Sequence, residues 1–197
     1  MNIKKVALFF CFIIAIEIIP MARVAIAKDL VCGLGFYYGE QVNWRAKNLK
    51  IVPTDNYNMK HDVLHPYIGF AWDLAELGLE GTIGAFRFYK NGKSSSVFAT
   101  GITLIGSYDF LEINERNRLY AGTGWGLSYW NRTPSIKLMN NKERPIITQL
   151  ELGWKNKVVN NHLKYLKVSY RFTHTSALTD RDDRGVNLHG LYLGFFF

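Results

Sequence analysis

Apolar and polar residues alternate along most of the chain beyond residue 28. In residues 118–130, Leu119 and Leu127 fall on one face of an extended chain. Gly122 and Gly126 fall on the opposite face. A period of two is typical of a β-strand with one apolar face. The pattern predicts eight such strands, at about residues 30–39, 67–74, 79–89, 97–110, 118–130, 146–155 and 164–176, and in a last segment that ends at Phe197.

Two stretches depart from this regular alternation. Residues 40–66 are predicted to form a long polar connection between the first two strands. Within residues 79–89 the parity of the apolar positions is ambiguous. A β-bulge shifts the alternation by one residue, so we predict a bulge in this strand.

The distribution of side chains over the two faces decides between two architectures, a soluble sandwich or barrel and an outer-membrane β-barrel. The apolar faces carry more aromatic side chains than eight strands can enclose. The opposite faces are rich in Gly and Ser, and their charged residues include Asp73, Glu151, Lys167 and Arg171. The pattern therefore predicts an all-β fold, an eight-stranded antiparallel transmembrane β-barrel of the outer membrane, with apolar side chains outside and paired charges within. A soluble sandwich is the alternative.

The first residues have the pattern of a secretory signal peptide. Lys4 and Lys5 precede an apolar stretch at residues 6–19, and a small-x-small cleavage site ends at Ala27. Polar residues and a proline interrupt the apolar stretch before the roughly 20 residues that a spanning helix needs. We expect residues 1–27 to be removed and residues 28–197 to form a single barrel domain in the outer membrane of a Gram-negative bacterium. An uncleaved membrane anchor is the alternative.

Charge and cysteine content narrow the class of protein further. The formal net charge of +8 suits an anionic surface, and nucleic acid is not expected as a partner of an exported protein. Removal of the signal peptide leaves Cys32 as the only cysteine, so an intramolecular disulfide is excluded. No cluster of residues has metal-ligand spacing, and no glycine-rich phosphate loop is present. We therefore expect no metal and no cofactor.

The predicted topology has both chain termini on the periplasmic side, which places the connections after the first, third, fifth and seventh strands at the cell surface. Their basic residues would form a rim that binds lipopolysaccharide phosphates, or would be ordinary solvated charges. These residues are Arg45, Lys47, Lys50, Lys60, Lys90, Lys93, Arg132, Lys137, Lys142, Arg144, Arg181 and Arg184. The terminal Phe197 resembles the signal that such barrels present to the barrel assembly machinery. The sequence leaves a homodimer open.

Candidate chemistry lies at the outer end of the seventh predicted strand. His174 and Ser176 share its lipid-facing side, where the outer leaflet begins. Counting back from Phe197 in steps of two places His189 and Asn187 on the same side of the last strand. A serine nucleophile needs a base and a group that orients the base, which Ser176, His174 and Asn187 could provide. The alternative is that they are polar residues tolerated at the membrane–water interface.

The end of the chain resembles the outer-membrane lipid A 3-O-deacylases, the PagL-type acyloxyacyl hydrolases. The resemblance covers about 27 residues, and the residues that carry it are Arg171, Phe172, His174, Ser176, Gly185, Val186 and Asn187. It implies an eight-stranded barrel with its active site on the lipid-facing outside, Ser176 as nucleophile and His174 as general base. In that family a glutamate stands at the position of Asn187, and an asparagine of the oxyanion hole stands at Ala177.

These observations lead to one functional hypothesis with two alternatives. The chain is expected to be a serine esterase, a carboxylic ester hydrolase that removes an ester-linked (hydroxy)acyl chain from the lipid A of lipopolysaccharide. Its catalytic residues would be Ser176, His174 and Asn187. The alternatives are a non-catalytic structural or adhesive barrel and a lipid A acyltransferase. His189 is an alternative base.

Overall fold

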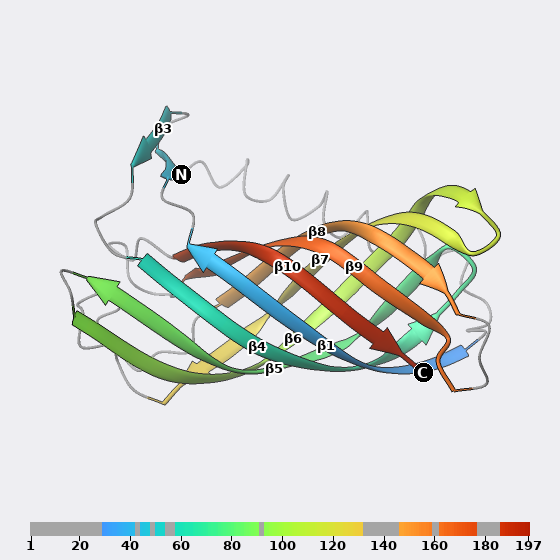
Figure 1. The fold of residues 1–197 in the computed structure, drawn as a ribbon, viewed down its shortest axis with the longest axis horizontal. Helices are drawn as coiled ribbons and strands as arrows, with labels where there is room; N and C mark the ends of the chain where they lie inside the picture. The colour runs from blue at the N-terminus through green and yellow to red at the C-terminus, as the bar shows by residue number, and fades with distance from the viewer. Residues whose placement is uncertain are drawn as a thin grey trace, which may run out of the picture.

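A computed structural model describes residues 29–41, 44–47, 50–53, 58–90, 93–131, 146–158, 162–176 and 186–197. Eight antiparallel strands close a barrel in the order β1-β10-β9-β8-β7-β6-β5-β4, and a separate hairpin pairs β2 with β3 (Figure 1). The barrel strands are β1 (Asp29–Gln41), β4 (Asn58–Ala71), β5 (Ala75–Lys90), β6 (Lys93–Asn114), β7 (Asn117–Trp130), β8 (Ile146–Lys157), β9 (Tyr165–Ser176) and β10 (Val186–Phe196). The hairpin strands are β2 (Trp44–Lys47) and β3 (Lys50–Pro53). The predicted all-β barrel is confirmed.

The barrel closes where the first and last strands meet. Leu34 of β1 is opposite Phe195 of β10, and the backbone N–H of Phe197 donates to the carbonyl of Cys32 at 2.7 Å. Each strand therefore has two neighbours, and no barrel edge remains unpaired. In barrels of this kind the longer loops are extracellular, which makes the end bearing the connections after β1, β7 and β9 the extracellular end.

The structure corrects three details of the predicted strands. The expected connection at residues 40–66 instead contains the hairpin and the first half of β4. The bulge predicted within residues 79–89 is wrong, because β5 keeps one register with both of its neighbours. Its apparent break comes from Gly81 and Ala85, small residues at outward positions. The described register shifts lie between β6 and β7, beside Asp109 and Glu112.

The outside of the barrel is apolar. The exposed large side chains include Leu30, Phe36, Ile68, Phe70, Phe98, Ile102, Trp125, Leu150, Leu152, Tyr170, Leu191 and Leu193. In water such a continuous apolar surface would cause barrels to associate with one another, whereas in a bilayer it contacts the apolar lipid chains favourably. The chain is therefore an outer-membrane β-barrel. Among the described residues, none lies in a helix long and apolar enough to cross a membrane.

The interior contains more aromatic rings than the prediction of a narrow Gly- and Ser-rich lumen allowed. One apolar cluster contains Tyr37, Val63, Phe86, Val97, Ala99, Trp130, Leu188 and Tyr192. A second contains Val31, Tyr67, Ile105, Tyr165 and Phe196. Inward-facing glycines make the room: a Cβ on Gly35 would overlap the ring of Tyr192, and a Cβ on Gly33 would lie 2.6 Å from the ring of Phe196. Glycine on one strand thus accommodates an aromatic ring from the next.

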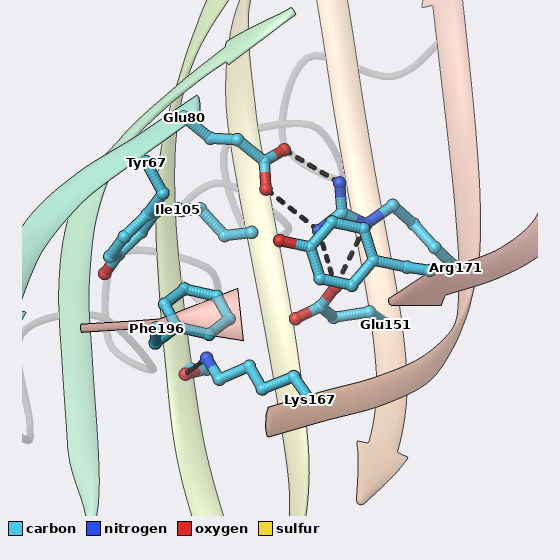
Figure 2. Close-up of a pocket in the computed structure, with 9 residues that line it drawn as sticks. Tyr67, Glu80, Ile105, Glu151, Lys167, Arg171 and Phe196 are labelled. Atoms are coloured by element: carbon cyan, nitrogen blue, oxygen red, sulfur yellow. Dashed lines mark hydrogen bonds and ion pairs between the residues drawn. The ribbon is translucent and has the colours of Figure 1, made fainter. Parts of the chain in front are cut away.

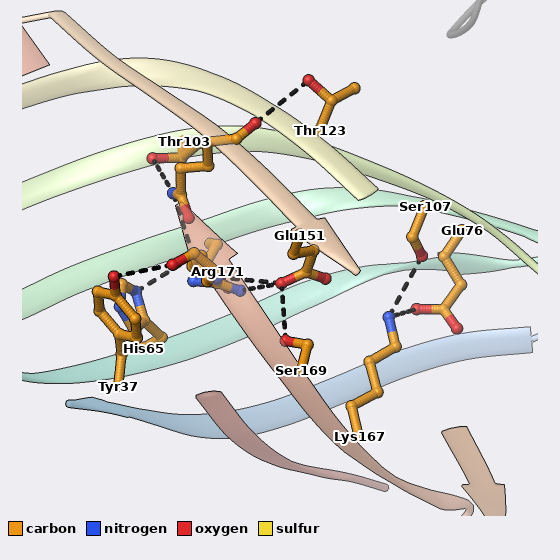
Figure 3. A network of polar contacts seen from close by, with 12 residues as sticks. Tyr37, His65, Glu76, Thr103, Ser107, Thr123, Glu151, Lys167, Ser169 and Arg171 are labelled. Atoms are coloured by element: carbon orange, nitrogen blue, oxygen red, sulfur yellow. Dashed lines mark hydrogen bonds and ion pairs between the residues drawn. The ribbon is translucent and has the colours of Figure 1, made fainter. Parts of the chain in front are cut away.

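Buried charges pair across the lumen beside the second cluster, where Lys155 and Lys167 lie over the ring of Tyr165. Lys155 Nζ lies 2.6 Å from Glu76 and 2.7 Å from Asp109, and Lys167 Nζ lies 2.7 Å from Glu76. Lys167 also donates to Ser107 at 3.3 Å (Figure 3). The predicted pairing of lumen charges is correct for Glu151, Lys167 and Arg171. Asp73 is the exception, because it lies largely exposed in the turn after β4.

Candidate active site on the outer face

The alternation of β9 and β10 places the candidate residues on the outside of the barrel. Thr173 and Thr175 of β9 are buried in the lumen, and so is Leu188 of β10, which is opposite Thr173 in the register. The residues between these inward positions must face outward. His174 and Asn187 occupy such positions, and the register pairs them directly.

His174 and Asn187 form a polar pair. The distance from His174 Nδ1 to Asn187 Oδ1 is 2.7 Å, and both residues are half-buried. An amide oxygen only accepts hydrogen bonds, so Nδ1 carries the hydrogen. The lone pair of the imidazole then resides on Nε2, the nitrogen that a general base uses. The pair therefore has the arrangement of a base with its orienting group.

Ser176 is the last residue of β9, two positions beyond His174, and its Cα is opposite that of Ile146 in β8. Its side chain lies outside the described part of the structure, as do Ala177 and Gly185 of the following connection. The signal peptide and half of the predicted basic rim also lie outside the described residues, and only the backbone is described for Arg45, Lys47, Lys50, Lys90 and Lys93. Lys60 is described, and it pairs with Glu40 at 3.1 Å.

Thr148 of β8 is a neighbour of the site that sequence reasoning missed. The register places it opposite His174, on the side away from Asn187. Directly opposite residues have Cβ atoms about 4.5–5.5 Å apart, so a hydroxyl flanks the imidazole. The strand pattern could have indicated it, since Thr148 is in phase with the outward Leu150 and Leu152. The strand pattern does not give the register between β8 and β9, which is what places Thr148 opposite His174.

A second outward histidine lies one pair further along β10. His189 Nδ1 hydrogen-bonds the hydroxyl of Tyr170, with the two ring centroids 5.7 Å apart. The register places Glu40 opposite His189 on β1. His189 thus bonds to Tyr170 and not to the end of β9 that bears Ser176. This arrangement favours His174 as the base.

Arg171 precedes these residues in the quoted motif but points into the lumen. Its guanidinium lies 2.7 Å from Glu80 and 2.8 Å from Glu151 (Figures 2 and 3). His65 Nδ1 lies 3.1 Å from the same Glu80 carboxylate. The ring of Tyr192 stacks on the guanidinium, with 3.9 Å from Cζ to the ring centroid. Arg171 therefore holds strands β5, β8 and β9 together and does not contact the outer site.

The lumen around Arg171 leaves no room for a substrate. The cavity enclosed there measures about 10 Å³, about the room of one water molecule. Aromatic and charged side chains fill this level of the barrel, as Figure 2 shows for Tyr67, Phe196 and Lys167. This level of the lumen therefore does not hold a substrate. No group of three His, Cys, Asp or Glu residues suited to a metal ion occurs within the described ranges.

Comparison with known proteins supports the fold. No protein-family model and no curated protein matches the chain. The Neisserial surface protein A structure superposes with a TM-score of 0.56 at 14% identity, over 85% of this chain and 95% of that one. The N-terminal β-barrel domain of Pseudomonas aeruginosa OprF has a TM-score of 0.41 at 16% identity, covering 84% and 97%. Ail, the attachment invasion locus protein of Yersinia pestis, has 0.39 at 12%, covering 85% and 97%. At these identities the first similarity shows the small-barrel fold, and the two lower scores add nothing to it.

Proposed function

We propose that the chain is an outer-membrane serine esterase that removes an ester-linked acyl chain from lipid A, as its resemblance to the PagL-type deacylases implies. The observation that carries the proposal is the hydrogen-bonded His174–Asn187 pair on the lipid-facing side of the barrel. A histidine oriented by an amide, two residues from a serine, has little reason to face the bilayer unless it acts on lipid. In the proposed orientation β9 ends in the outer leaflet, where lipid A carries its ester groups.

The acylation step uses three residues of the chain. His174 Nε2 takes the proton of the Ser176 hydroxyl while Oγ attacks the ester carbonyl carbon. Asn187 accepts the Nδ1–H and keeps the ring in the orientation that this transfer needs. The tetrahedral intermediate then collapses: the bond from carbon to the sugar oxygen breaks, and His174 returns the proton to that oxygen. The products are an acyl-serine and a lipid A with a free hydroxyl.

The deacylation step repeats this chemistry with water. His174 takes a proton from a water molecule that attacks the acyl-serine carbonyl, and the proton passes to the departing Ser176 Oγ. A free fatty acid leaves, and the enzyme is restored. The asparagine that serves the oxyanion hole in the deacylase family is replaced by Ala177, and loss of one such donor costs about 10²–10³ in rate. We therefore propose a slow esterase.

Mass spectrometry of lipid A tests the proposal. Cells that make a hexa-acylated lipid A and lack such an esterase would express the full chain, with an empty vector as control. Barrel insertion is verified by the heat-dependent shift in gel mobility. The expected result is a lipid A species that lacks one acyl chain, together with the released fatty acid. Unchanged lipid A despite inserted protein would overturn the esterase and favour a structural or adhesive barrel, and a gained acyl chain would favour an acyltransferase.

Substitution of Asn187 by glutamate should raise the rate of deacylation about tenfold. A carboxylate opposite Nδ1 keeps the same tautomer and stabilises the imidazolium that forms during attack, which a neutral amide does less well. The measurement is the initial rate of fatty acid release by purified protein in mixed micelles. Asn187→Leu is the matched control: it removes the acceptor and should lower the rate. Equal rates for all three forms would show that Asn187 does not orient the base.

A further inference from the structure

A band of charged side chains crosses the outer face of four neighbouring strands. The register places His189 of β10, Glu40 of β1, Lys60 of β4 and Arg87 of β5 in one row, each opposite the next. The row below it, towards the membrane, begins with Leu191 and contains Tyr38, Asp62 and Ala85. The following row is entirely apolar and consists of Leu193, Phe36, Leu64 and Ile83. The outer surface of these strands thus changes from charged to entirely apolar within two successive rows of outward residues.

The charges in this band balance one another. Lys60 Nζ lies 3.1 Å from Glu40, whose carboxylate also accepts a hydrogen bond from the Tyr38 hydroxyl at 3.2 Å. Arg87 lies 3.3 Å from Asp62. The four charged side chains are each about half exposed, so an incoming ligand can reach both the cations and the carboxylates. Two cations and two anions side by side form a neutral but strongly polar patch.

An apolar groove begins directly below this band. It measures about 520 Å³, within the range of about 300–1,000 Å³ that is typical of small-molecule sites. Its walls come from the apolar row, with Phe36, Leu64, Ile83 and Leu193, and it is bounded at the polar end by Asp62. An acyl chain that lies along the barrel would occupy such a groove while its headgroup meets the charged band.

We propose that this surface is a binding site for a zwitterionic phospholipid of the phosphoethanolamine type. The phosphate accepts hydrogen bonds from Lys60 and Arg87, the ammonium donates to Glu40 and Asp62, and one acyl chain lies in the groove. A neutral, alternating patch matches a headgroup that carries one charge of each sign. A lipid whose headgroup carries only a negative charge has no ammonium to pair with the carboxylates of Glu40 and Asp62, so these carboxylates repel it. Charge complementarity therefore selects the zwitterion.

This site is separate from the His174–Asn187 pair and does not depend on the proposed esterase activity. Asn187 and Leu191 are four residues apart on β10, about 13 Å at about 3.3 Å per residue. The groove is centred on β1 and β4, one and two strands beyond β10. The variant Ser176→Ala should consequently bind phospholipid as the wild type does, whether or not the chain hydrolyses lipid A.

Native mass spectrometry of the full chain in detergent micelles tests the site. The probes are phosphatidylethanolamine, phosphatidylglycerol and lipid A, each titrated separately. Phosphatidylethanolamine should bind one molecule per barrel, about fivefold more tightly than phosphatidylglycerol; the factor is below tenfold because the charges are half exposed. Lys60→Gln should weaken binding of both phospholipids, Glu40→Gln should remove the preference for phosphatidylethanolamine, and Leu64→Trp should weaken binding about tenfold by filling the groove.

Two variants on other parts of the barrel serve as matched controls. Lys157→Gln removes an exposed lysine at the periplasmic end of β8, and Leu152→Trp enlarges an exposed leucine of the same strand. Both should bind phosphatidylethanolamine as the wild type does. Equal or tighter binding of phosphatidylglycerol or lipid A would overturn the assignment. The assignment would also be overturned if no lipid bound, or if the control variants lost as much phosphatidylethanolamine binding as the site variants.

Discussion

Replacing Arg171 by methionine should lower the free energy of unfolding by about 3–5 kcal/mol, the cost of leaving a buried charge without its partner. The Arg171 side chain is 1% exposed and holds the carboxylates of Glu80 and Glu151, which are equally buried. Methionine fills similar space but donates no hydrogen bond. Two carboxylates would then remain in the lumen without the guanidinium, and Glu80 would keep only its contact with His65 Nδ1 at 3.1 Å. The measurement is urea-induced unfolding in detergent micelles, followed by tryptophan fluorescence.

Arg87→Met is the matched control for this experiment. Arg87 also pairs with a carboxylate, but both side chains are more than half exposed. An exposed pair contributes only about 0–1 kcal/mol, so this variant should unfold close to the wild type. A triple variant with Arg171→Met, Glu80→Gln and Glu151→Gln should recover much of the loss, because no uncompensated charge remains. A small effect of Arg171→Met alone would show that water enters the lumen and solvates both carboxylates.

The strands that could be predicted from the sequence are those in which each face has one chemical character. β7 alternates glycines with large apolar residues, and its predicted range of 118–130 lies within one residue of the observed strand. β4 could not be predicted in full because it crosses the charged band. Lys60 and Asp62 are outward and polar, whereas Val63 is inward and apolar, which inverts the usual pattern there. Where a strand extends beyond the bilayer, its outward residues are no longer apolar, so the alternation that predicts a membrane strand is absent.

The content of the lumen could be predicted only in part, because it depends on contacts between strands distant in sequence. Arg171 and Glu80 are 91 residues apart and meet across the barrel. Position in the alternation indicated that Arg171 faces inward but named no partner. Aromatic rings such as Tyr192 fit inside because glycines on neighbouring strands leave space for them. Neither fact is visible in a single strand.

The candidate site was easier to predict, because it needs only parity and the pairing of consecutive strands. Counting from Phe197 placed Asn187 on the lipid-facing side, and the hairpin between β9 and β10 brings it opposite His174. Thr148 was missed because the connection between β8 and β9 fixes a register that the sequence does not reveal. What the site does chemically stays a prediction, which substitution of its residues tests directly.

Ser176→Ala and His174→Gln should each lower the rate of lipid A deacylation by at least about 10³-fold. A serine nucleophile and its histidine base act as one unit, so loss of either removes the acyl-enzyme route. For the same reason the double variant should be no slower than either single one. The measurement is fatty acid release from lipid A by purified protein in mixed micelles. Circular dichroism and the heat-dependent gel shift confirm that each variant forms the barrel.

His189→Gln is the matched control, because His189 is the other outward histidine of the same hairpin and bonds to Tyr170. It should leave the rate unchanged if His174 is the base. The reverse outcome, in which His189→Gln abolishes release and His174→Gln does not, would move the base to the Tyr170–His189 pair. Additive losses in the Ser176 and His174 double variant would mean that the two residues act independently. A serine activated by this histidine predicts the opposite, since the proton that Ser176 must lose has His174 as its acceptor.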